Sequence, residues 1–162
     1  MLPETVVDMS LAHRPEFIIS GGQTGVDRAA LDVALALAID HGGFCPRGRR
    51  AEDGRIDARY QLVETPTDRY PERTEKNVRS SDATLIVHRG VLTAGTALTR
   101  RLATLHHCPC FVADVDEPDI ADRIADWLAE LQPKRLNIAG PRESSVPGIH
   151  DATARLLTEL WR

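Results

Sequence analysis

The fold of this chain is decided by the stretch Phe17–Ala30, which reads FIISGGQTGVDRAA. A short β-branched run stops at two glycines, and a helical pattern begins a few residues later. Free backbone N–H groups and the helix dipole favour negative charge at such a helix start. The stretch therefore predicts a strand, a phosphate-binding turn and a helix, with an ordinary strand-to-helix turn as the alternative.

The residues of this turn supply three kinds of contact. The glycines leave the backbone open to a ligand, two neutral side chains add hydrogen-bond donors, and an arginine one turn into the helix adds a planar cationic fork. The candidate binding residues of this loop are Gly21, Gly22, Gln23, Thr24, Gly25 and Arg28. The spacing is neither that of the dinucleotide fingerprint nor that of the Walker loop.

Composition limits the class of protein. A chain of 162 residues with 42% hydrophobic residues suits one packed domain, and its net charge of −4 argues against general binding of nucleic acid or membrane surfaces. Three cysteines without C-x-x-C spacing indicate neither a disulfide framework nor a zinc site. With no signal peptide and no long apolar run, we expect a cytoplasmic protein.

Strand-like and helix-like segments alternate along the chain, which predicts an α/β, Rossmann-like three-layer fold with a mostly parallel sheet and helices on both faces. We expect a flexible tail over residues 1–14 and a single ligand-binding domain over residues 15–162. The expected strands are 16–20, 43–45, 61–64, 83–88, 110–115 and 136–139. The expected helices are 24–41, 70–80, 96–106, 148–161 and one that opens at 116–118.

The segment Val26–Ile39 is apolar around most of its girth. Helices of this kind lie deep in a core or at a subunit interface. A small domain has little room for a fully buried helix, so we favour the interface.

Three expected strands end in ligand-binding chemistry. The first ends in the Gly-Gly turn described above, the second leads to Gly95-Thr96 at a helix start, and the third is followed by Arg142. Parallel strands present their carboxyl ends at one edge of the sheet, where ligands of doubly wound folds bind. Together the three loops predict a pocket for a phosphorylated ligand.

A fourth candidate is the basic loop that contains Arg47, Gly48, Arg49 and Arg50, followed by Glu52 and Asp53. Arginine forks could close over phosphate, and a following acid could accept a hydrogen bond from a ring N–H or a ribose hydroxyl. A solvated surface loop is the alternative interpretation.

The sequence shows no catalytic constellation. Its histidines lack metal-ligand spacing, and no serine lies in a nucleophile elbow. We therefore expect no catalytic residues, no metal ligated by the protein and no enzymatic turnover.

Five blocks of the chain resemble one family: GGQTGVDRAALDVA, GFCPRGRRAEDGRI, RTEKNVRSSDATLIV, GTALT and LNIAGPRES. In this order they are similar to the molybdenum cofactor carrier proteins. That family is a circularly permuted branch of the SLOG superfamily, which also contains the lysine-decarboxylase-like, cytokinin-activating proteins and nucleotide-sensing Rossmann domains. The resemblance extends from about Phe17 to Trp161.

The resemblance implies a homo-oligomer, a dimer or tetramer, and a pocket for a phosphorylated pterin-like or nucleotide-like ligand, with the molybdenum cofactor (molybdopterin) as the cargo. It assigns the glycine loop, the basic loop and Gly95-Thr96 to ligand binding. Thr93-Ala94 stands where such families carry a Gly-Gly pair, so the second loop is expected to bind less closely.

A second departure concerns catalysis. The cytokinin-activating hydrolases carry a carboxylate three residues after this threonine, where Thr99 stands here. A hydroxyl cannot replace a carboxylate as general base near neutral pH. Circular permutation leaves room for another acid at that place: Glu52, Asp53, Glu64 or Glu143.

The sequence thus predicts a protein that carries or stores a phosphorylated pterin-type ligand without turnover. A sensor of nucleotide derivatives such as ADP-ribose is the second hypothesis. A nucleotide phosphoribohydrolase is the third.

Overall fold

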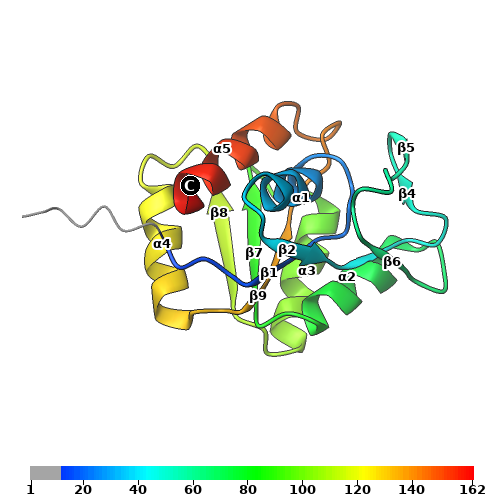
Figure 1. The fold of residues 1–162 in the computed structure, drawn as a ribbon, viewed down its shortest axis with the longest axis horizontal. Helices are drawn as coiled ribbons and strands as arrows, with labels where there is room; N and C mark the ends of the chain where they lie inside the picture. The colour runs from blue at the N-terminus through cyan, green and yellow to red at the C-terminus, as the bar shows by residue number, and fades with distance from the viewer. Residues whose placement is uncertain (1–11) are drawn as a thin grey trace, which may run out of the picture.

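A computed structural model describes residues 12–162 of the protein. Its centre is a sheet of five parallel strands in the order β2-β1-β9-β7-β8 (Figure 1). The strands are β1 Phe17–Ile19, β2 Asp40–Gly42, β7 Ala83–His88, β8 Cys110–Asp114 and β9 Arg135–Ala139. The inner strands β7 and β9 are almost wholly buried, because helices cover both of their faces.

Five helices complete the three layers. They are α1 Val26–Ala36, α2 Tyr70–Arg79, α3 Ala94–Leu105, α4 Ile120–Leu131 and α5 Ile149–Trp161. The main apolar core joins α1, α4 and α5 to one face of the sheet, while α2 and α3 pack together against the other. The predicted α/β, Rossmann-like architecture is confirmed.

A lobe of residues 43–69 extends from the sheet between β2 and α2, at the right of Figure 1. Within it, β3 Phe44–Cys45 pairs with β6 Val63–Glu64, and β4 Arg50–Ala51 forms a hairpin with β5 Gly54–Arg55. A second apolar cluster anchors the lobe to α1. Its members are Leu31, Cys45, Ile56 and Tyr60.

The expected helix over residues 24–41 is wrong at its C-terminal end. The helix stops at Ala36, Ala38 adopts a left-handed φ of 54°, and Asp40–Gly42 forms the edge strand β2. Gly42, the residue directly after the expected helix, is the last residue of this strand. A Cβ on Gly42 would lie 2.7 Å from the Phe17 ring, so this glycine lets β2 approach its neighbour.

The apolar side chains around α1 are covered by other parts of the same chain. Helix α5 packs along it, and the second apolar cluster covers Leu31. Of its large hydrophobic side chains, Leu35 is the exposed one, at 43%. The reason for expecting a subunit interface on this helix is therefore removed.

Most of the predicted N-terminal tail lies outside the described residues. Of the part that is described, Ala12 N donates to Leu160 O at 3.0 Å, and Trp161 Nε1 donates to His13 O at 3.0 Å. Ala12 and His13 are thereby held against the end of α5.

Candidate ligand-binding site

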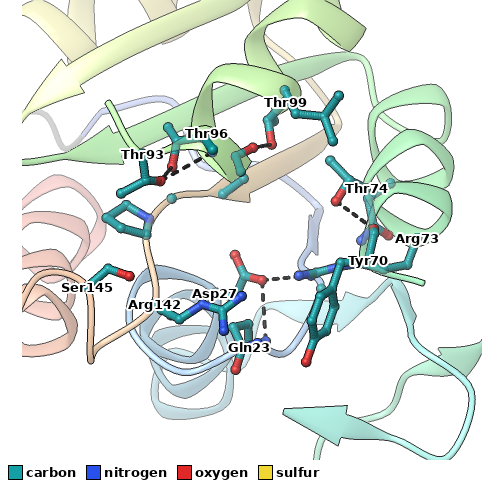
Figure 2. Close-up of a pocket in the computed structure, with 18 of the residues that line it drawn as sticks. Gln23, Asp27, Tyr70, Arg73, Thr74, Thr93, Thr96, Thr99, Arg142 and Ser145 are labelled. Carbon is teal, nitrogen blue, oxygen red and sulfur yellow. Dashed lines mark hydrogen bonds and ion pairs between the residues drawn. The ribbon is translucent and has the colours of Figure 1, made fainter. Parts of the chain in front are cut away.

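A cavity of about 540 Å³ opens at the carboxyl ends of β1, β7 and β9. This is where the strand order reverses, as in other doubly wound sheets that bind ligands. Its walls come from the loops after β1 and β9, from the first turns of α3, and from α2 (Figure 2). The two loops and the start of α3 were predicted from the sequence to bind the ligand. The contribution of α2 was not predicted.

One wall is the N-terminus of α3. Thr93 caps the helix by accepting a hydrogen bond from Thr96 N at 3.4 Å, and the hydroxyls of these two residues lie 2.9 Å apart. Gly95 faces open space, since a Cβ there would meet nothing within 4 Å. The first backbone N–H groups of the helix lack intrahelical partners and favour an anion here.

The opposite end of the cavity holds an ion pair between Asp27 and Arg73. Arg73 Nη1 donates to Asp27 Oδ2 at 2.9 Å, and their side chains are 12% and 6% exposed, respectively. A Cβ on Gly21 would lie 1.4 Å from Arg73 Nη1, so this glycine makes the pair possible. Burial raises the pKa of Asp27, and the Arg73 guanidinium offsets part of that rise.

Gln23 lines the same end and is 5% exposed. Its Oε1 accepts hydrogen bonds from Thr24 N at 3.0 Å and Glu52 N at 2.9 Å. Its Nε2 is buried without a partner among the described residues. Two backbone donors thus fix the amide orientation and leave one side-chain donor for a ligand.

The third wall follows β9 and carries Arg142, Ser144 and Ser145. The guanidinium of Arg142 lies over the ring of Tyr70, 5.5 Å from its centroid, and Arg73 approaches the same ring at 5.5 Å. Figure 2 shows Arg142 reaching from this wall toward Gln23 and Asp27. Two guanidinium groups and one carboxylate give the lining side chains a formal charge of +1, in a chain whose net charge is −4.

The structure brings five of the sequence-predicted residues together around the cavity. These are Gly21, Gln23, Gly95, Thr96 and Arg142. The remaining predicted residues lie outside its lining: Gly22, Thr24, Gly25, Arg28, Arg47, Gly48, Arg49 and Arg50.

Gly25 and Gly22 serve packing within the chain. A Cβ on Gly25 would lie 2.3 Å from Pro141 O, and one on Gly22 would lie 2.6 Å from Leu62 Cδ1. These glycines let the loop after β9 and the lobe approach the loop after β1. They shape the site without lining it.

Arg49 and Arg50 of the basic loop have partners within the lobe, as does Arg28 on α1. Arg49 donates to four backbone carbonyls of the lobe, at distances of 2.7 to 3.4 Å. Arg50 pairs with Asp68 at 2.9 Å, and Arg28 pairs with Asp53 at 2.9 Å. Arg47 is exposed. Binding of phosphate by this loop stays a prediction, and the observed contacts of Arg49 and Arg28 hold the lobe together and onto α1.

The four acids considered as replacements for the missing carboxylate also lie outside the lining. Glu143 accepts from Gly148 N and His150 N at the start of α5, and Glu64 accepts from Gly48 N. Glu52 binds the Ser144 hydroxyl and the Thr24 hydroxyl. Asp27 is the one carboxylate among the lining residues.

Sequence reasoning missed several lining residues on α2, among them Tyr70, Arg73 and Asn77. The charged segment of this helix is typical of a structural helix face, yet Asn77 is buried and accepts from Phe44 N at 2.7 Å. An arginine and a tyrosine one helical turn apart gave a weak signal, because such pairs are common on exposed helices.

Within residues 12–162, no group of three or more His, Cys, Asp or Glu side chains is arranged to hold a metal ion. None of the helices described there has the length and hydrophobicity that crossing a bilayer requires.

The sequence profile of the circularly permuted YpsA SLOG family matches residues 18–161. The chain belongs to this family. This chain is similar to a protein from Syntrophus aciditrophicus SB whose crystal structure is named "Putative molybdenum carrier protein". The sequence identity is 46% and the TM-score is 0.90. The match covers 94% of this chain and 98% of that one. A comparison with curated proteins found no significant match.

Proposed function

We propose that this SLOG-family protein binds a phosphorylated heterocycle in the cavity and holds it without turnover. Its specific function in this proposal is to carry or store the pterin-type molybdenum cofactor. The name of the similar Syntrophus protein supports the cargo. The observation that carries the binding itself is a cavity lined by a helix N-terminus and two arginines in a chain of opposite net charge.

The phosphate binds at the wall formed by α3 and the loop after β9. Gly95 leaves the helix N-terminus open, and Thr96, Ser144 and Ser145 supply hydroxyl donors. Arg142 supplies the charge. At the opposite end Asp27 and Arg73 neutralise each other, so this ion pair adds no net charge to attract a phosphate there.

Binding without turnover agrees with the hydrogen bonds of two polar side chains: Thr99, which stands where the hydrolases carry a carboxylate, and Asp27, the carboxylate among the lining residues. The Thr99 hydroxyl donates to Gly95 O at 3.1 Å within its helix. One oxygen of Asp27 is already bound by Arg73 and by Gln23 N. Thr99 is thus engaged within its helix, and Asp27 serves as the ion-pair partner of the buried Arg73 guanidinium.

Calorimetry with isolated molybdenum cofactor tests the carrier function. Saturable binding is expected; no binding at tens of micromolar protein, together with no activity in a cofactor-transfer assay, would contradict it. Tight binding of ADP-ribose without binding of the cofactor would favour the sensor. Conversion of AMP to adenine and ribose phosphate, lost on Asp27→Asn, would favour the phosphoribohydrolase.

Arg142→Ala tests the phosphate position. We expect the affinity for the cofactor to fall at least about tenfold, because a charge-assisted hydrogen bond contributes about 1.5–3 kcal/mol. Arg50→Ala is the matched control, since Arg50 is exposed and pairs with Asp68 outside the cavity. A loss for Arg50→Ala with none for Arg142→Ala would move the phosphate to the basic loop.

The proposal also includes a cytoplasmic homo-oligomer. Light scattering on the purified protein measures the oligomeric state, and a monomer would contradict this part alone.

A further inference from the structure

At the Asp27 end of the cavity, Arg73 Nε is buried without a partner, and two further polar groups there also lack one among the described residues. The first is Gln23 Nε2. Because Thr24 N and Glu52 N both donate to Gln23 Oε1, the amide cannot rotate without losing two hydrogen bonds. The amide nitrogen is therefore fixed at this end of the cavity, whose lining includes Gln23.

The second group is Asp27 Oδ1. The other oxygen, Oδ2, accepts from Arg73 Nη1 at 2.9 Å and from Gln23 N at 3.3 Å, whereas Oδ1 has no hydrogen bond within residues 12–162. Figure 2 shows this second oxygen pointing into the cavity, on the side of α3. Asp27 is 4% exposed, so the free oxygen is an acceptor in a largely dry environment.

The donor and the acceptor belong to two residues that line the same end of the cavity, where Gln23 N donates to Asp27 Oδ2 at 3.3 Å. A ring that pairs with both groups needs a carbonyl to accept from Gln23 Nε2 and an adjacent N–H to donate to Asp27 Oδ1. This combination is a cyclic amide. Oxo-purines and oxo-pterins carry this pair, whereas adenine carries the reverse pair: an amino donor next to a ring-nitrogen acceptor. Because buried polar groups left unpaired are costly, a site of this kind discriminates strongly between the two edges.

We propose that the Asp27–Gln23 end of the cavity binds the cyclic amide edge of an oxo-purine or an oxo-pterin and rejects the corresponding amino ring. This inference rests on the proposed function, since it places the ring of the phosphorylated ligand. The phosphate at the α3 end and the amide edge at Asp27 together fix the direction in which the ligand lies.

Matched pairs of ligands test the inference by calorimetry. Inosine monophosphate and adenosine monophosphate differ only at this edge, and a 4-oxopterin and a 4-aminopterin carrying the same phosphate form the second pair. We expect the oxo member to bind at least about tenfold more tightly in each pair that binds. Equal affinity, or preference for the amino member, overturns the inference while leaving the proposed function intact.

Asp27→Asn is expected to abolish the preference. Arg73 and Gln23 N are donors, so they hold the Asn oxygen, and the Asn amide nitrogen takes the place of the free Oδ1. The cavity then presents two donors, so the oxo ring and the amino ring each make one hydrogen bond and each face one mismatch. Asp116→Asn, at an exposed residue paired with Arg89, is the control and should keep the preference of the unmodified protein.

Gln23→Glu provides a second readout that does not depend on the Asp27 variant folding. One carboxylate oxygen keeps the backbone contacts, and the other repels the ring carbonyl. Binding of inosine monophosphate should fall more than binding of adenosine monophosphate, and an equal fall contradicts the assignment. If no member of either pair binds the unmodified protein, the proposed function fails together with this inference.

Discussion

At the scale of single residues, the cavity depends on a buried ion pair that a glycine makes possible. Arg73 Nη1 occupies the space in which a Cβ of residue 21 would lie, and there it neutralises Asp27. Loss of one partner from such a pair leaves an uncompensated buried charge. The glycine expected to expose backbone to a phosphate is thus needed for a contact inside the protein.

Gly21→Ala should displace the Arg73 guanidinium and destabilise the protein by about 3 kcal/mol, because Asp27 loses its partner. Urea unfolding measures the change. Gly95→Ala is the matched control, since its Cβ would meet nothing within 4 Å. Its stability should stay within about 0.5 kcal/mol of the unmodified protein. Equal stability of both variants would show that Arg73 finds another position at no cost.

At the scale of elements, side chains from the lobe and α5 tie down the loops of the cavity. Glu52, at the turn of the β4–β5 hairpin, accepts from Ser144 N at 3.1 Å and holds Gln23 through its own backbone N–H. His150 on α5 binds Asp32 on α1 at 2.8 Å, and the Tyr60 hydroxyl of the lobe donates to the same carboxylate. The β4–β5 hairpin, α1 and α5 therefore together hold the loops of the cavity in place.

The contact of His150 should make stability depend on pH. Burial works to lower the pKa of His150, but the hydrogen bonds with Asp32 and Asp151 outweigh it and place the pKa above the ordinary 6.5. The folded state therefore binds this proton more tightly than the unfolded state. The stabilisation is fully present below pH 6.5 and is lost as the pH rises through the folded-state pKa.

His150→Gln should flatten this dependence. Between pH 6 and pH 8.5 the unmodified protein is expected to lose up to about 1 kcal/mol more than the variant, since the pair is partly exposed. Urea unfolding at several pH values measures the difference. His107→Gln, at an exposed histidine, serves as the control. Parallel profiles for all three proteins would rule out the contribution of His150.

At the scale of the whole molecule, the cavity walls come from residues 21–27, 70–77, 93–99 and 137–145. These segments are far apart in the sequence and meet only because the parallel strands end at one edge. A ligand that contacts all of them binds the folded state alone. Its binding is therefore linked to global stability.

Ligand binding should raise the midpoint of thermal unfolding. Inosine monophosphate at a hundred times its dissociation constant adds about 2.7 kcal/mol, which corresponds to roughly 5–11 °C for a domain of this size. Scanning calorimetry with increasing nucleotide measures the shift. The Arg142→Ala variant should need a higher concentration for the same shift. A midpoint that stays constant while calorimetry reports binding would mean that the ligand also binds the unfolded chain.

The fold was predictable because alternating apolar runs and glycine turns act locally. Periodicity located α2, β7, α4 and α5 to within a few residues. It failed at Asp40–Gly42, where a short polar edge strand carries no apolar pattern and forms only by pairing with β1. The β4–β5 hairpin was missed for the same reason, since its strands are two residues long.

The sequence by itself determined the layered α/β fold and the three loops at one sheet edge, because both follow from residue periodicity and the rule that parallel strands end together. Only the tertiary structure decided which side chains face the cavity. Arg49 and Arg28 bind partners in the lobe, whereas Arg73 and Asp27, which are 46 residues apart in the sequence, form an ion pair in the cavity. Opposite charges pair according to distance in space, and pairing over such separations leaves no local pattern in the sequence.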